Sequence, residues 1–187
     1  MPSADPCIDR SILFSVDKIR KYSRNLLLFS DVSFDIYQDE LVGLVGLPGF
    51  AADEEIDVVD SILRPDGGVV KFKGEDVTGS KPHKLAAKGL VRTFQKPVMF
   101  TDLAVIESVI LAHHLQFKLP WWRTIFRNDQ ETREARISAS DILDSLGLTE
   151  MKDMRAKDLR YDQKKTLGVA IALAAQPDFL IMDQPPV

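Results

Sequence analysis

The chain has 187 residues, of which 45% are hydrophobic and 28% are charged, a balance typical of a folded globular protein. It carries 24 Lys and Arg residues against 28 Asp and Glu residues, and the net charge of −4 argues against a nucleic-acid-binding surface. The single cysteine, Cys7, excludes an internal disulfide, and no cluster of Cys and His has zinc-site spacing. The sequence has no apolar run of about 18 residues, as a membrane-spanning helix requires, and its first residues lack a signal-peptide pattern. We therefore expect one domain, with no nucleic-acid partner and no transmembrane segment of its own.

Short apolar segments alternate with amphipathic ones along the chain, and their spacing predicts the secondary structure. Strands are expected at residues 12–19, 26–29, 32–36, 41–45, 69–72, 90–94 and 179–182. Helices are expected at about residues 53–63, 84–88, 104–115, 130–146 and 163–175, with a turn at 65–68. The continuously apolar runs at 41–45 and 179–182 are typical of strands buried on both faces. Strands that alternate with helices predict an α/β fold with a central, partly parallel sheet.

The segment from 41 to 63 has the order strand, glycine-containing loop and helix, a setting in which many proteins bind phosphate. Read from its first glycine, the phosphate-loop pattern G-x-x-x-x-G-K-[ST] falls on residues 46–53. The candidate phosphate-binding residues are therefore Gly46, Gly49, Ala51, Ala52 and Asp53, with Glu54 directly after them in the first helical turn. Ala52 and Asp53 thus stand where the lysine and the hydroxyl residue belong. A carboxylate there repels a phosphate by about 1 kcal/mol per charge pair in water. By itself the segment also fits a buried strand that turns into a helix, and Asp53 could instead hold a metal ion.

Five further segments occur in the order and spacing of one known family. They are residues 21–22, 63–68, 91–97, 159–163 and 176–185. Through them the chain, from about residue 12 to 185, resembles the ATP-binding subunit of ABC transporters, and within these the importers for branched-chain amino acids and urea. The sequence L-R-Y-D-Q at 159–163 stands at the family's L-S-G-G-Q signature, and F-L-I-M-D-Q at 179–184 stands at its Walker B strand.

The resemblance implies a fold and a domain layout. The fold is an α/β, P-loop NTPase-like ABC ATPase core with an antiparallel β subdomain and a helical subdomain, incomplete at the C-terminus. Residues 1–11 would be an N-terminal tail and residues 12–187 a single ABC ATPase-like domain. Within it, 12–94 would form the first part of the nucleotide-binding core, 95–175 a mostly helical subdomain, and 176–187 the Walker B strand and the chain end.

The resemblance also implies a role for each matching residue, with ATP and Mg²⁺ as the cofactors. Tyr22 would stack on adenine, Gln95 would reach Mg²⁺ and the attacking water, and Asp183 would contact Mg²⁺ through water. The residues that would bind the γ-phosphate of ATP held by a partner subunit are Leu159, Arg160, Tyr161, Asp162 and Gln163. Simpler interpretations are a strand-end aromatic for Tyr22, an ordinary loop glutamine for Gln95 and a turn cap for Asp183.

Four departures from the family pattern remove groups that hydrolysis needs. Gln184 stands at the position of the catalytic glutamate, and its amide cannot accept a proton as a general base. Asp162 replaces a signature glycine, Ala52 replaces the phosphate-binding lysine, and the family's switch histidine would lie beyond Val187. Because positioned charges dominate phosphoryl transfer, we do not expect this chain to hydrolyse ATP at a normal family rate.

Three hypotheses follow. The chain is an ATP-binding subunit, or a fragment of one, of an ABC importer for branched-chain amino acids, urea or related small solutes. Alternatively it is a non-catalytic interaction or regulatory protein that docks on an ABC permease or an intact ATPase partner, or a decayed, truncated gene product. The implied partners are the permease membrane subunits and a second ATP-binding subunit, in a homo- or heterodimer. The implied location is cytoplasmic, peripheral on the cytoplasmic face of the inner membrane.

Overall fold

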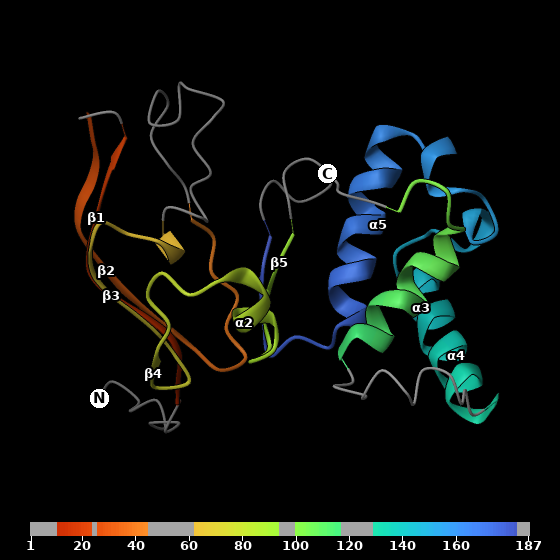
Figure 1. Ribbon diagram of the computed structural model, residues 1–187, viewed down its shortest axis with the longest axis horizontal. Coiled ribbons are helices and arrows are strands. Elements are labelled where there is room, and N and C mark those ends of the chain that lie inside the picture. Colours follow the sequence, from red (N-terminus) through yellow and green to blue (C-terminus); the bar gives the residue numbers. More distant parts are fainter. Residues whose placement is uncertain (1–10, 24–25, 45–61, 94–99, 117–128, 183–187) are drawn as a thin grey trace, which may run out of the picture. The chain divides into compact units, whose positions relative to one another are not determined.

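The computed structural model describes residues 11–23, 26–44, 62–93, 100–116 and 129–182 (Figure 1). The chain divides into two units, Met1–Lys81 and Pro82–Val187, and each is described by itself. The first unit holds a four-stranded antiparallel sheet in the order β2-β1-β3-β4. Its strands are β1 (Ile12–Ser23), β2 (Leu26–Tyr37), β3 (Gly67–Phe72) and β4 (Glu75–Asp76). The strands predicted at 12–19 and 69–72 are thereby confirmed.

One face of this sheet forms the core of the first unit. Phe14 and Val16 of β1 pair across the ladder with Phe72 and Val70 of β3, and all four side chains are buried. They alternate along each strand with more exposed residues, as the two-residue period of a strand requires. These cross-strand apolar pairs help to hold β1 and β3 in register.

Strand β2 is one element where the sequence predicted two. The polar residues at 30–31 separate two apolar runs, and Asp31 has a positive φ of 54°. The strand nevertheless continues, because Phe29 pairs with Lys21 and Val32 pairs with Ile19, and shifts in register absorb the irregularity. The prediction of two separate strands at 26–29 and 32–36 is therefore wrong, because both segments belong to one continuous strand.

The buried strand predicted at 41–45 is absent from the described part of that segment. Residues 41–44 have no strand conformation and are exposed, and the most exposed apolar side chain among them, that of Leu41, retains 91% of its accessible surface. An apolar run becomes a buried strand only when strands pair with it on both sides, and no described strand pairs with residues 41–44. Of the helix predicted at 53–63, only residues 62–63 are described, and these are helical.

The second unit combines a parallel strand pair with helices. Its elements are α2 (Pro82–Ala86), β5 (Leu90–Arg92), α3 (Val105–Gln116), α4 (Asp129–Ser145), η1 (Thr149–Met151), η2 (Ala156–Asp158), α5 (Tyr161–Ala174) and β6 (Phe179–Ile181). Strands β5 and β6 are parallel, with Leu90 opposite Phe179. All four helices predicted between residues 84 and 175 are confirmed, as is a parallel pair made from the runs at 90–94 and 179–182.

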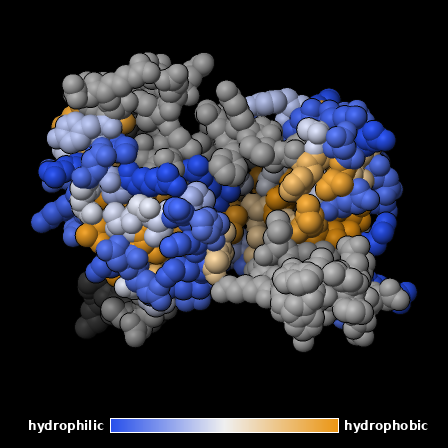
Figure 2. Space-filling model, in the orientation of Figure 1, coloured by the Kyte–Doolittle hydropathy of each residue, from blue (hydrophilic) through white to orange (hydrophobic). Residues whose placement is uncertain are grey.

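Helices α3, α4 and α5 pack around a common apolar cluster. Val105 and Val109 of α3, Leu143 of α4 and Leu167 of α5 are completely or almost completely buried within it. In Figure 2, hydrophobic side chains gather on the visible face of this unit where Figure 1 draws α3 and α5. The cluster fixes the start of α5, because Leu159, two residues before that helix, is also part of it.

Candidate functional site

Tyr22, the residue expected to stack on adenine, lies one residue before the end of β1. Its side chain is half-exposed, at 48%, so the ring is open to a planar group from solvent. On one side its backbone pairs with Leu27 of β2. On the other side its N–H donates to the carboxylate of Asp66, with 2.8 Å between Tyr22 N and Asp66 Oδ2. The backbone of Tyr22 is thus held from both sides while its ring remains accessible.

Asp66 is itself fixed by several groups. Its own N–H donates to the carbonyl of Arg20 at 2.8 Å, and its Oδ1 lies 3.4 Å from the ammonium of Lys21. That ammonium also donates to the carbonyl of Arg64 at 2.8 Å. The hydrogen bond from the Tyr22 N–H, and then the positive charge of Lys21, lower the pKa of Asp66 below its usual value. The residue is therefore a carboxylate at neutral pH, with both oxygens engaged.

The signature segment forms the beginning of α5. Leu159 is buried, whereas Arg160, Tyr161 and Asp162 are exposed. The backbone N–H of Arg160 donates to Gln163 Oε1 at 3.0 Å, which is one half of a capping box. The segment therefore has the geometry expected of a helix start that presents backbone N–H groups.

A charged pair occupies the first turn of that helix. The guanidinium of Arg160 lies 2.8 Å from Asp162 Oδ2. A carboxylate in the first helical turn is favoured by the helix dipole, so the charge of Asp162 interacts favourably with the start of α5. The ammonium of Lys164, in the same turn, donates to the carbonyl of Lys157 at 2.8 Å.

Nine of the predicted site residues lie outside the described part of the chain. They are Gly46, Gly49, Ala51, Ala52, Asp53, Glu54, Gln95, Asp183 and Gln184. Tyr22 belongs to the first unit and the signature segment to the second, so the structure gives the local geometry of each but does not place them together. Their roles remain predictions.

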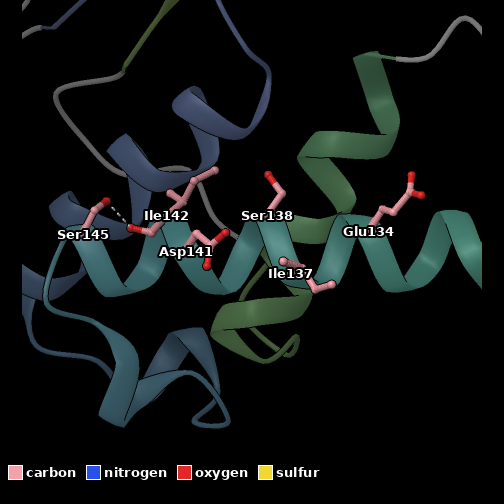
Figure 3. Close-up of a pocket in the computed structure, with 6 residues that line it drawn as sticks. All are labelled: Glu134, Ile137, Ser138, Asp141, Ile142 and Ser145. Carbon is pink, nitrogen blue, oxygen red and sulfur yellow. Dashed lines mark hydrogen bonds between the residues drawn. The ribbon is translucent and has the colours of Figure 1, made fainter.

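A shallow hollow that the sequence did not single out lies along α4. It has a volume of about 450 Å³, and the close-up in Figure 3 shows that all six residues lining it come from one helix. They are Glu134, Ile137, Ser138, Asp141, Ile142 and Ser145. None of the predicted site residues lines it. The signal was present in the sequence, because this helical spacing places two isoleucines on an otherwise polar face.

Comparison with protein families decides the relationship. The family model described as ABC transporter matches residues 29–187. This chain belongs to the ABC transporter family. The resemblance drawn from the motifs is therefore confirmed, and it rests on a match over most of the chain rather than on single segments.

Individual relatives within the ABC transporter family agree with this. The chain is 28% identical over 176 residues to the high-affinity branched-chain amino acid transport ATP-binding protein LivG of Escherichia coli K12, covering 92% of this chain and 69% of that protein. It is also 28% identical over 163 residues to the corresponding protein BraF of Pseudomonas aeruginosa, covering 86% of this chain and 64% of BraF. A probable LivG of Methanocaldococcus jannaschii is 26% identical over 178 residues, covering 95% of this chain and 69% of that protein.

Solved structures show the same fold. A nucleotide-free ATP-binding cassette from an ABC transporter matches with a TM-score of 0.69 and 23% identity, covering 95% of this chain and 70% of that one. An ATP-binding cassette dimer in a post-hydrolysis state, bound to ADP and Pi, matches with a TM-score of 0.73 and 18% identity, covering 92% of this chain and 74% of that one. The predicted ABC ATPase fold is therefore confirmed, over about 70% of such a cassette.

Two further findings concern the described residues of this ABC family member. Among them, no three His, Cys, Asp or Glu side chains are grouped so that they could hold a metal ion. The proposed Mg²⁺ contacts, Gln95 and Asp183, lie outside that part of the chain. No described helix is both long enough and apolar enough to cross a membrane.

Proposed function

We propose that this chain is an ATP-binding subunit, or part of one, of an ABC importer for branched-chain amino acids, urea or related small solutes. The observation that carries the proposal is the similarity to LivG over 92% of the chain. The solute is assigned by that similarity alone. The expected partners are the permease membrane subunits and a second ATP-binding subunit, and docking on the former would place the chain peripherally on the membrane.

The ligand of the site is ATP with Mg²⁺, bound at the base through Tyr22. The half-exposed ring at the end of β1 supports this assignment, because an open aromatic face can stack on a nucleobase. At the phosphate end, Gln95 and Asp183 are the residues that would contact Mg²⁺. Ala52 offers no positive charge to the phosphates, so we expect affinity below that of a subunit with an intact phosphate loop.

Hydrolysis at a normal family rate is not part of the proposed activity. Gln184 has no basic group to accept a proton from water. At the start of α5, Asp162 places a carboxylate, paired with Arg160, where the signature would meet a partner's γ-phosphate. That pair favours a second candidate function, a non-catalytic subunit that completes an assembly with an intact ATPase partner or with a permease.

Thermal denaturation with and without Mg-ATP separates the two candidates. Ligand at a hundredfold excess over its Kd stabilises the folded state by about 2.7 kcal/mol, which for a chain of this size raises Tm by about 5–10 °C. A shift supports the first candidate. The absence of a shift at saturating nucleotide, together with co-purification with co-expressed permease subunits or an intact ATPase subunit, supports the second. A chain with neither a shift nor a partner refutes both.

Restoring the phosphate loop provides an independent check. The triple variant Ala51→Gly, Ala52→Lys, Asp53→Thr supplies the second glycine, the lysine and the hydroxyl, and we expect it to bind Mg-ATP more tightly than the wild type. Tyr22→Ala in the same background is the matched control, because it removes the base contact and leaves the restored loop unchanged. Unchanged affinity in the triple variant shows that the loop has been assigned to the wrong residues.

A further inference from the structure

The end of β1 is held by a residue 44 positions further along the chain. The ladder between β1 and β3 has a register shift after Asp17 and ends where Arg20 pairs with Gly67. Beyond that pair, no strand in the described part of the chain pairs with residues 21–23 on the β3 side. The Asp66 side chain takes over there, because its carboxylate accepts the Tyr22 N–H at 2.8 Å.

The geometry of an antiparallel sheet explains why this contact forms. Backbone groups of residues i and i+2 point to the same side of a strand, so the carbonyl of Arg20 and the N–H of Tyr22 face the same turn. Asp66 meets both, donating its N–H to Arg20 and accepting from Tyr22 through its side chain. It therefore extends the pairing of β1 by one step beyond the end of β3.

The charge on Asp66 is balanced locally. Lys21, whose side chain is only 23% exposed, lies 3.4 Å from Asp66 Oδ1 and is anchored to the carbonyl of Arg64. Hydrogen bonds between a carboxylate and a backbone N–H are about twice as strong as neutral ones. The pairing with Lys21 also reduces the repulsion that a bare carboxylate would exert on the phosphates of a nearby nucleotide.

We propose that Asp66 is a positioning residue for adenine recognition. By fixing the backbone of Tyr22, it holds the aromatic ring in the orientation that stacks on the base of ATP. The inference rests on the proposed function, since it requires Tyr22 to contact the base. It assigns Asp66 no contact with the nucleotide.

A double-mutant cycle on the full chain tests the proposal, with the Kd for Mg-ATP measured by titration calorimetry. Base–aromatic stacking contributes about 1–3 kcal/mol, so Tyr22→Ala is expected to weaken binding by about tenfold or more. Asp66→Ala is expected to weaken it by a similar factor. The double variant should bind no worse than Tyr22→Ala alone, because Asp66 acts only through Tyr22.

Asp76→Ala is the matched control. Asp76, in the same sheet, also accepts a backbone N–H, that of Thr78 at 2.9 Å, and its pKa is lowered by its hydrogen bonds with Thr78. Its hydrogen bonds go to Thr78 rather than to Tyr22, so its removal should leave the Kd within about twofold of wild type. If Asp66→Ala does not fold, Asp66→Asn replaces it. The amide oxygen still accepts the Tyr22 N–H but lacks the charge, and we expect a loss of about threefold that again disappears in the Tyr22→Ala background.

The outcomes separate the inference from the proposed function. If the wild type binds Mg-ATP and the Asp66 variants bind equally well, the positioning role is refuted and the proposed function stands. The same conclusion follows if the losses multiply in the double variant, because Asp66 would then act independently of Tyr22. If the wild type binds no Mg-ATP, the proposed ATP-binding function fails and the inference fails with it.

Discussion

Gly68 provides the sharpest test of the packing between β1 and β3. It is the second residue of β3 and has a φ of +91°, a region that residues with a side chain rarely adopt. A Cβ at this position would lie 2.5 Å from the carbonyl oxygen of Lys18, 2.6 Å from that of Asp17 and 2.6 Å from the Cα of Ile19. All three atoms belong to the backbone of β1, so relief requires the strand itself to move.

The magnitude follows from two separate costs. The left-handed conformation costs a residue with a Cβ about 1–2 kcal/mol. Forcing a methyl group into packed surroundings costs about a further 1–3 kcal/mol. Gly68→Ala should therefore lower the free energy of unfolding by about 2–5 kcal/mol.

Gly74→Ala isolates the first of these costs. Gly74 also has a positive φ, +78°, but a Cβ there would meet no atom of the described residues within 4 Å. Gly74 lies two residues after the end of β3 and Gly68 is the second residue of that strand, so the two variants probe its two ends. We expect Gly74→Ala to lower the free energy of unfolding by only about 1–2 kcal/mol. Urea denaturation followed by circular dichroism measures both. Equal losses would show that the close approach of β1 to Gly68 is not real.

Three other predictions concern the core, the pH dependence and the start of α5. Leu167→Ala removes a completely buried side chain between the helices and should lower the free energy of unfolding by about 2–5 kcal/mol, whereas Ile137→Ser on the exposed face of α4 should change it by less than about 0.5 kcal/mol in urea denaturation. Folding lowers the pKa of the Asp66 carboxyl, so this group stabilises the folded state above its unfolded pKa of about 3.9. That stabilisation is lost as the pH falls through the lower pKa of the folded state. Asp66→Asn should therefore make Tm less dependent on pH below about pH 4 than it is in the wild type, as measured by thermal denaturation at several pH values. Asp162→Gly removes a carboxylate from the first turn of α5 and its pair with Arg160, and should lower stability by about 1 kcal/mol at low salt and by less at high salt, measured by thermal denaturation.

The apolar runs at 41–45 and 179–182 show how far the sequence predicts this fold. Both have the pattern of a buried strand, and the pattern alone does not distinguish them. Residues 179–181 form β6 because β5 pairs with them in parallel, while residues 41–44 have no described strand partner and are exposed. The amphipathic helices were easier to predict, since the apolar stripe that identifies a helix is also the face that packs.

In the candidate site, too, a local sequence pattern does not reveal which distant residues come into contact. Tyr22 and the signature segment are predicted as site residues from their order along the chain. The contact between Tyr22 and Asp66 could not be predicted in this way, because it joins residues 44 positions apart and depends on where β3 ends. The sequence identified Asp66 only as part of a turn at 65–68, whereas the structure has a bend at Asp66 and β3 already begins at Gly67.

The two ends of the proposed nucleotide site differ from the family motifs to unequal extents. At the phosphate end, Ala52 and Asp53 lack the positive charge and hydroxyl of the motif, and Gln184 lacks the catalytic carboxylate. At the base end, the aromatic residue is present, and Asp66 fixes its backbone with a charge-assisted hydrogen bond. Binding to a base depends on an open aromatic face, whereas hydrolysis depends on positioned charges around the γ-phosphate. A chain with these residues can therefore recognise adenine while lacking groups that hydrolysis needs. For that reason, affinity for ATP, rather than its hydrolysis, is the property to measure first.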